Sequence, residues 1–395
     1  MRPKLILILL LATVLNIGCG EKEAENKMII VKNPLDIARA FETVEIELKP
    51  LVEDTADAKL ITYGIIDSET KKEIVSQTVD ANGDGVPDFL LFQPQIDALA
   101  ERSFEVITLN RSMTSDSIPA CYSRFVPERT DDYAWENNRV AFRTYGPMAQ
   151  KMAEDKVKGG TLSSGIDAWL KRVDYPIINK WYKEELSGEV SYHEDTGEGL
   201  DNFHVGPSRG VGGIAMKVDS TYYTSKNFTS WKNLYNGPIR TSFILTYADW
   251  DADGNTISEE KHISLDYGSN LSRFEVSLKG TDTISAGLTL HKKDGVIGVD
   301  HEEGWVTYWE PHDDSELGMA IVVPNNMMMG HEHYETDAKD ESNLFAHLKV
   351  DQQKVVYYAG FGWKKSDQFA NKEEWQSYVS TFSKKLNNPM IVGVK

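Results

Sequence analysis

The sequence is poor in cysteine, in positive charge and in long apolar runs. Two cysteines among 395 residues cannot form a disulfide framework. The 42 basic residues against 61 acidic ones give a formal charge of −19, which argues against a general nucleic-acid binder because such proteins need a basic surface. The same deficit means that any anionic ligand has to be met by a few local cations. Walker, dinucleotide-binding and Gly-X-Ser-X-Gly motifs are absent as well.

The longest apolar run, residues 5–15, lies in a basic N-terminus and is too short to span a bilayer comfortably. It ends shortly before Cys19, which follows a small residue, and this pattern predicts a bacterial lipoprotein. We expect a signal peptide at 1–18, lipidation of Cys19 and a polar tether at 19–27; an ordinary cleaved signal is the alternative. The protein would then be exported and held at the cell envelope, in the periplasm or at the outer membrane, touching the membrane only through its lipid.

Alternation of apolar and polar residues dominates from residue 28 onward and predicts half-buried antiparallel strands. Examples are residues 43–48 and 240–247, and residues 355–363 are expected to form another, buried strand with glycines at its end. Helical periodicity is sparse and is clearest in the tail after Asn371, where Glu374 completes a capping-box pattern. Because such strands must stack or close to hide their apolar sides, we expect a mainly β protein with a large antiparallel β-sandwich and a C-terminal helix.

A polar, turn-forming run at 110–117 interrupts the strand pattern. It predicts a boundary between a smaller N-terminal β module at 28–110 and a larger catalytic domain at 111–395. The sequence leaves the oligomeric state open.

One turn carries oxygen side chains at alternate positions, namely Asp80, Asn82, Asp84 and Asp88, with glycines between them. Calcium loops use this spacing because a hard cation needs several oxygens around one bend. The distal glutamate of an EF-hand is missing, and a hairpin turn stabilised by Asp and Asn side chains explains the pattern equally well. A structural calcium is therefore one of two interpretations, and no other cofactor is required.

Residues 131–147 mix apolar and charged side chains in one strand-like segment. Trp135 belongs to its apolar set, whereas Arg139 and Arg143 have the same parity and would share one face of a strand. Two neighbouring guanidinium groups suit a carboxylate or a sulfate, which they can grip bidentately. An internal ion pair with Glu136 or Asp132 is the alternative.

The densest chemistry lies at 192–210, where Tyr192, His193, His204 and Arg209 stand among acidic residues and glycines. Such a loop can supply a general base with its partner, or a metal site. A merely acidic and flexible surface loop is the alternative. Farther on, His333 and Tyr334 follow His331 and Glu332, but no third zinc ligand is fixed by the spacing.

Several segments together resemble a family of exported bacterial proteins catalogued as a domain of unknown function, which includes an ulvan oligosaccharide dehydratase. The resemblance covers roughly residues 30–390 and rests on DDYAWENNRVAFRTYGP, SGIDAWLKRVDYPIINKWY, YHEDTGEGLDNFHVGPSRGVGG, NGPIRTSFILTY, HISLDYGSNLSRFEV and YYAGFGW. It implies the β-supersandwich of galactose-mutarotase-like proteins. It also implies removal of water from the non-reducing-end glucuronic or iduronic acid of a sulfated, ulvan-type oligosaccharide, which leaves a 4,5-unsaturated uronate.

That elimination takes the proton at C5, beside the carboxylate, and protonates the departing hydroxyl at C4, so it needs a cation, a base and an acid. On residue chemistry alone, the cation is Arg139, Arg143 or Arg209, and His193 and His204 transfer the protons. Tyr192 or Tyr334 is the alternative acid. The expected sugar-contacting residues are Trp135, Arg139, Arg143, Trp169, Lys171 and His333. A non-catalytic oligosaccharide-binding lipoprotein and a chain-cleaving lyase are the competing functions.

Overall fold

The computed structural model describes residues 27–49, 62–109, 118–324 and 326–395. The predicted signal peptide, Cys19, nearly all of the tether and the 110–117 run lie outside the described residues. Within the described ranges, no helix is long and apolar enough to cross a membrane.

The N-terminal unit consists of two small antiparallel sheets. Its strands are β1 (Met28–Lys32), β2 (Val44–Glu47), β3 (Thr62–Asp67), β4 (Glu73–Ile74), β5 (Ser76–Val79), β6 (Phe89–Phe92), β7 (Glu101–Leu109) and β27 (Ile391–Val394). The sheet orders are β27-β1-β7-β3-β4 and β2-β6-β5. Alternate residues of both sheets, such as Ile29, Ile46 and Phe104, meet in a core of their own.

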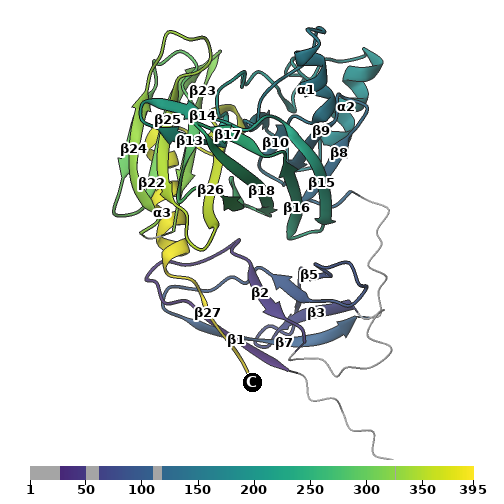
Figure 1. The fold of residues 1–395 in the computed structure, drawn as a ribbon. Helices are drawn as coiled ribbons and strands as arrows, with labels where there is room; N and C mark the ends of the chain where they lie inside the picture. The colour runs from purple at the N-terminus through teal and green to yellow at the C-terminus, as the bar shows by residue number, and fades with distance from the viewer. Residues whose placement is uncertain (1–26, 50–61, 110–117, 325) are drawn as a thin grey trace, which may run out of the picture.

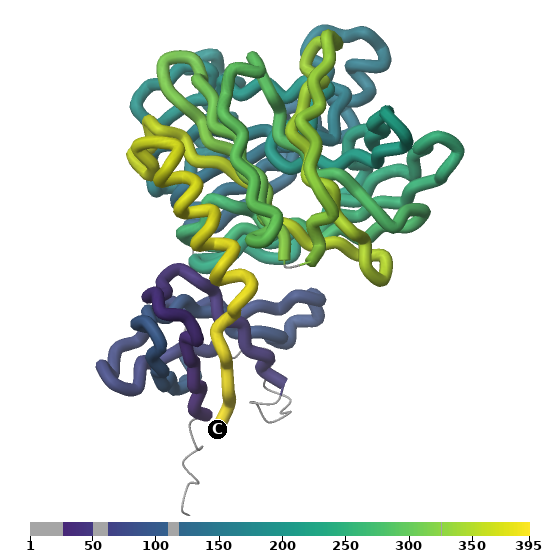
Figure 2. Tube along the Cα trace, turned by 90° about the vertical axis from the view of Figure 1, so that its left-hand side faces the viewer, coloured from purple at the N-terminus to yellow at the C-terminus, as the bar shows by residue number. Residues whose placement is uncertain are grey.

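The last strand of this unit comes from the other end of the chain. β27 pairs antiparallel with β1, from Ile29 opposite Val394 to Lys32 opposite Ile391. In Figures 1 and 2 the chain descends from the large upper unit to the purple N-terminal strands and ends beside them. The expected domain at 111–395 therefore differs from the structure at its C-terminal end. There the residues of β27 complete the N-terminal sheet instead of belonging to the larger unit.

The larger unit contains three further antiparallel sheets. The nine-stranded sheet consists of β15 (Phe228–Tyr235), β16 (Arg240–Tyr247), β17 (Trp250–Ala252), β18 (Asn255–Asp266), β19 (Leu271–Lys279), β21 (Val296–Asp300), β22 (Trp305–His312), β23 (Ser315–Val322) and β26 (Lys354–Trp363). A five-stranded sheet consists of β13 (Val211–Val218), β14 (Thr221–Tyr223), β20 (Thr283–Thr289), β24 (Met328–Tyr334) and β25 (Asn343–Lys349). The other five-stranded sheet consists of β8 (Tyr122–Val126), β9 (Asp132–Glu136), β10 (Ala141–Thr144), β11 (Asp167–Lys171) and β12 (Gly199–Leu200).

The apolar faces of these three sheets meet in one core, so the mainly β, sandwich-type prediction is confirmed. β22 illustrates how the alternation works. Its Val306 and Tyr308 face the central core, whereas Trp305 and Trp309 face outward. The outward pair is covered by the C-terminal helix α3 (Lys372–Asn387), and the nine-stranded sheet is thereby buried on both faces at this point.

The predicted helix α3 is present with its predicted cap. The Asn371 side chain accepts a hydrogen bond from the Glu374 amide at 2.9 Å, and the Glu374 carboxylate accepts one from the Ala370 amide at 2.8 Å. A short 3₁₀ turn, η2 (Lys364–Ser366), precedes it. Two further helices, α1 (Pro147–Glu154) and α2 (Ile178–Ser187), were not expected from the sequence.

Candidate functional site

A hollow of about 520 Å³ lies where β10, the segment after α1 and the 192–210 loop converge. It is lined by Arg143, Tyr145, Gly160, Thr161, Leu162, His193, Asp201, Asn202, Phe203, His204, Val205, Gly206 and Pro207. Two glycines with positive φ bring the loop against the sheet. A side chain at Gly199 (φ +113°) would collide with the Leu170 carbonyl, and one at Gly210 (φ +58°) with the Ile166 carbonyl.

His193 projects from this loop with about half of its side chain exposed. Its Nδ1 lies 2.6 Å from the backbone carbonyl oxygen of Asp201. Because a carbonyl only accepts hydrogen bonds, Nδ1 must carry a hydrogen, and in the neutral ring Nε2 then carries the lone pair. This arrangement suits a general base.

His204 has the opposite arrangement on the same hollow. Its Nε2 lies 2.9 Å from the carboxylate oxygen Oδ2 of Asp340, which requires the hydrogen to sit on Nε2. Nδ1 is then the nitrogen that can take up or release a second proton. The two histidines therefore offer different ring atoms to a bound molecule.

Arg143 forms one wall of the hollow and is itself buried. Its guanidinium donates to Asp167 at 2.5 Å and to Asp201 at 2.8 Å, and its Nη1 donates to the Tyr192 hydroxyl at 3.3 Å. It also lies 3.8 Å from Asp132. Of the internal ion pairs that the sequence offered as an alternative to anion binding, the one with Asp132 is therefore present. Several carboxyl groups therefore share one guanidinium.

This crowding shifts the proton affinities of the acids. Burial raises the pKa of Asp201 from 3.8 to about 8, with a further contribution from the charge of Asp167, although Arg143 opposes the rise. Burial also raises the pKa of Asp132 to about 6, against the effect of Arg143 and Arg129. Burial thus favours the neutral form of the Asp201 carboxyl group, which lines the hollow.

Tyr145 is a lining residue that was not selected from the sequence. Its hydroxyl donates to Asp167 at 3.3 Å, and burial together with the charge of Asp167 raises its pKa well above the ordinary value. Its parity matches that of Arg143 two residues earlier, and this spacing could have identified it. The sequence analysis did not single out Asp201, which is one of several acidic residues in the 192–210 loop.

Arg209 and Tyr192 do not line the hollow. Arg209 is buried, its guanidinium donates to Ser164 Oγ and to the carbonyls of Ile214 and Pro207, and burial lowers its pKa to about 10. The Tyr192 ring is buried too, and its hydroxyl accepts hydrogen bonds from Arg143 and Arg129. Both residues support the loop from inside the protein.

Three of the expected sugar-contacting residues belong to the core. Trp135 is fully buried and donates to Ser272, and Trp169 is fully buried beneath the Arg143 guanidinium. Lys171 is buried in an ion pair with Glu136 at 2.8 Å. None of the three can stack on a sugar in this conformation.

Arg139 does not accompany Arg143, because β10 begins only at Ala141 and Arg139 lies in the preceding turn. Its Nε donates to Asn270, and its guanidinium lies 5.9 Å from the Phe369 ring. It lines a different cavity, of about 680 Å³, between the N-terminal unit and the larger one. That cavity contains none of the histidines discussed above.

His333 and Tyr334 lie on β24 and are also absent from the hollow. His333 pairs with Glu335 at 2.8 Å, and the Tyr334 ring lies against Tyr222, with 5.1 Å between centroids.

In the 80–88 turn, side-chain oxygens accept backbone hydrogen bonds. Asp80 accepts from Gly83 and Gly85, Asn82 from Asp84, Asp84 from Val86, and Asp88 from Ala81. These contacts match the hairpin interpretation, while calcium binding stays a prediction.

A group that the sequence did not reveal lies behind the 202–204 segment. It consists of His291, Glu310 and His312, whose potential ligand atoms lie within 4.8 Å of one another. His312 stands apart from the other histidines in the sequence. Its spacing of two from Glu310 on a strand places both on one face, but His291 comes from a different part of the chain.

The chain belongs to the family described as a domain of unknown function, DUF4861, which matches residues 31–392. A relative from Formosa agariphila, described as uncharacterized protein P7, is 54% identical over 396 residues, and the match covers 100% of both chains.

Two solved structures are similar at much lower identity. A protein in the glycosyl hydrolase family 38 from Enterococcus faecalis is 10% identical with a TM-score of 0.49, covering 94% of this chain and 47% of that one. An alpha-mannosidase from Enterococcus faecalis V583 is 12% identical with a TM-score of 0.44, covering 93% and 46%. The chain thus spans about half the length of each.

Proposed function

We propose that this protein is a hydro-lyase that removes water across C4–C5 of the glucuronic or iduronic acid at the non-reducing end of a sulfated, ulvan-type oligosaccharide. The product is a 4,5-unsaturated uronate. The observation that carries the proposal is the joint presence, in one hollow, of two histidines with opposite hydrogen placement and a buried arginine beside Asp201, whose pKa is raised by burial.

The first requirement of the reaction is to neutralise the substrate carboxylate, because its charge makes the neighbouring C5 proton very weakly acidic. In the proposed complex this group faces Arg143 and Asp201. The guanidinium supplies positive charge, and the protonated carboxyl group of Asp201 donates a hydrogen bond. A second ionised carboxylate at Asp201 would repel the substrate instead, so the raised pKa of Asp201 supports the assignment.

The second requirement is a base and an acid. We assign the base to His193, whose Nε2 lone pair is available because Nδ1 donates to the Asp201 carbonyl. His204 is the acid, and its Nδ1 delivers the proton to the leaving C4 oxygen while Nε2 stays bonded to Asp340. The electron pair of the broken C5–H bond forms the new double bond, and the C4 oxygen departs as water.

The volume of the hollow favours a terminal sugar as substrate. About 520 Å³ falls within the range of small-molecule sites. In the described part of the chain, Arg143 is the only Arg or Lys side chain that lines the hollow, in keeping with one carboxylate per bound end.

A defined saturated uronate–rhamnose oligosaccharide tests the proposal. Incubation should give a product lighter by one water, of unchanged chain length, with the ultraviolet absorbance of a conjugated double bond. Two shorter fragments would instead identify a chain-cleaving lyase. Binding without any change of mass would identify a non-catalytic oligosaccharide-binding protein.

We also propose export and lipid anchoring through Cys19. The support is the apolar stretch at 5–15 that ends shortly before this cysteine. Incorporation of labelled palmitate in a bacterial host should be lost in Cys19→Ser, and equal labelling of both proteins would contradict the proposal.

A further inference from the structure

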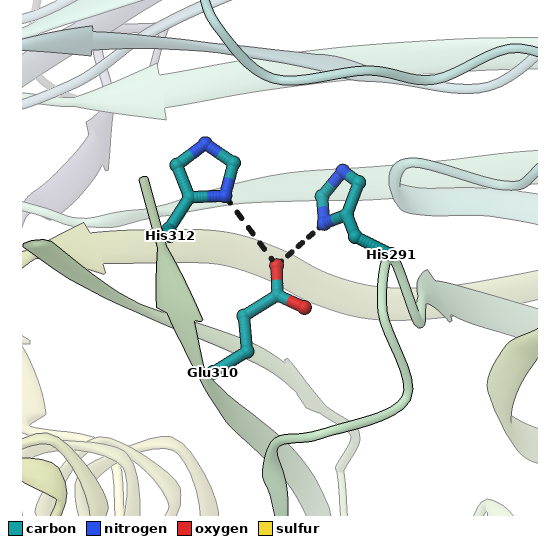
Figure 3. A group of neighbouring side chains, drawn as sticks. All are labelled: His291, Glu310 and His312. Carbon is teal, nitrogen blue, oxygen red and sulfur yellow. Dashed lines mark hydrogen bonds and ion pairs between the residues drawn. The ribbon is translucent and has the colours of Figure 1, made fainter. Parts of the chain in front are cut away.

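We propose that His291, Glu310 and His312 bind one zinc ion, and that this ion fixes the segment that carries His204. Glu310 and His312 lie two residues apart on β22 and share one face, and His291 follows the end of β20. Figure 3 shows both imidazole rings turned toward the same carboxylate oxygen of Glu310. Two histidines and one carboxylate form a common zinc donor set.

The distances are close to those of a metal site. Nδ1 of His291 lies 2.5 Å and Nδ1 of His312 lies 3.7 Å from Oε1 of Glu310. Tetrahedral zinc with bonds of about 2.0–2.1 Å separates its ligand atoms by roughly 3.3 Å. His312 therefore already stands at a suitable distance, and His291 needs to move back from Glu310 by less than about 1 Å.

The hydrogen-bonding state of the group independently points to a ligand. Glu310 is fully buried and its Oε2 has no hydrogen-bond partner among the described residues. His312 is nearly buried, with 8% of its side chain exposed, and turns its Nδ1 toward the same carboxylate. Its Nδ1 lies 3.7 Å from Glu310, beyond hydrogen-bond range, so His312 is incompletely satisfied as it stands.

The orientation of His291 matches that of a metal-bound histidine. Its Nε2 lies 3.1 Å from the backbone carbonyl oxygen of His204, which requires a hydrogen on Nε2. Metal-bound histidines usually donate their second ring hydrogen to such a carbonyl, which leaves the other nitrogen free to bind the ion. Here that other nitrogen is Nδ1, the atom that faces Glu310.

A zinc ion at this site would restrain two residues that line the hollow. The Phe203 ring packs on His291 with 4.6 Å between centroids, and His291 holds the His204 carbonyl. An ion that fixes His291 therefore also fixes Phe203 and His204, which line the hollow. Because His291, Glu310 and His312 do not line it themselves, we assign the zinc a positioning role.

The test uses the purified protein made without a polyhistidine tag, stripped with a chelator and titrated with zinc chloride. We expect about one zinc per chain and a rise of a few degrees in the unfolding temperature. His312→Asn should lose at least about 100-fold in zinc affinity and should lack the temperature rise. Glu310→Gln should behave in the same way, and it keeps a hydrogen-bonding group beside His291.

His301→Ala is the matched control, because His301 and His331 form an exposed imidazole pair elsewhere on the chain, 2.9 Å apart. This variant should bind zinc like the wild type. The proposal is overturned if the wild type binds no zinc, or if binding survives in both His312→Asn and Glu310→Gln. Because the readout is metal binding, the result does not depend on the proposed dehydration.

Discussion

The hydrogen placement on His193 is set by the backbone rather than by another side chain. Its Nδ1 is tied to the Asp201 carbonyl at 2.6 Å, and this contact fixes which nitrogen can accept a proton. Asp201 thus acts twice at the hollow, through its carbonyl on the base and through its carboxyl group beside Arg143.

We expect His193→Gln to lower kcat/KM for the uronate oligosaccharide by about 10²–10⁴-fold, because glutamine cannot take up the C5 proton. His301→Gln, at an exposed histidine outside the hollow, should retain wild-type activity. Progress curves of ultraviolet absorbance measure both. Equal activity of the two variants would remove His193 from the mechanism.

The raised pKa of Asp201 gives a pH prediction. The group stays protonated up to about pH 8 and then ionises, so activity should decline as the pH rises through that value. Folding stability should respond in the same direction. Because the folded pKa lies above the unfolded value of 3.8, this group's contribution is complete below about pH 4 and is lost as the pH rises toward 8.

The variant Asp201→Asn tests whether the alkaline decline in activity comes from the ionisation of Asp201. The charged and titratable groups near it are Arg143, Asp167, Asp132 and His193. Asparagine stays neutral, so the decline above pH 8 should disappear from the pH–rate profile of any remaining activity. An alkaline decline identical to that of the wild type would assign it to another group.

The sequence predicted part of this site from residue type alone. Arg143, His193 and His204 were selected because guanidinium and imidazole groups suit the chemistry, and the structure brings them to one hollow. Arg209 was selected for the same reason but is buried. Residue type does not show whether a charge faces water or forms hydrogen bonds inside the protein.

At the scale of elements, helix α2 depends on a buried carboxylate from another strand. Glu136, at the end of β9, accepts hydrogen bonds from the amides of Ile177 and Ile178 and pairs with Lys171. The helix start is therefore satisfied by a tertiary contact. This is why α2 was missed, whereas α3 carries its own Asn371 cap and was predicted.

Glu136→Ala should destabilise the protein by about 3–5 kcal/mol, because the Lys171 ammonium would remain buried without its partner. The double change Glu136→Met with Lys171→Met should cost less than the single one, since neither charge is then left behind. Denaturant unfolding of the two variants measures the difference. A double variant less stable than Glu136→Ala would contradict this account.

The strands were more predictable than the helices for a physical reason. A strand that is buried on one face needs alternation, and β2 and β16 show it in their residues. Which strands become neighbours is decided by contacts far apart in sequence. The pairing of β1 with β27, residues near opposite ends of the chain, has no local signal.

At the scale of the whole molecule, two units with separate cores share one chain that leaves the N-terminal unit and returns to it. Among the residues that the structure describes, those lining the hollow all belong to the larger unit. The proposed chemistry therefore belongs to the large sandwich, whose sheets hold β10 and the 192–210 loop in place.

The most direct measurement uses an oligosaccharide with deuterium at C5 of its terminal uronate. If His193 removes that hydrogen and water leaves from C4, the wild-type product carries no deuterium, the reaction is slower than with the protium substrate, and His193→Gln forms almost no product. A dehydrated product that retains its deuterium, or no dehydration at all, would contradict the account.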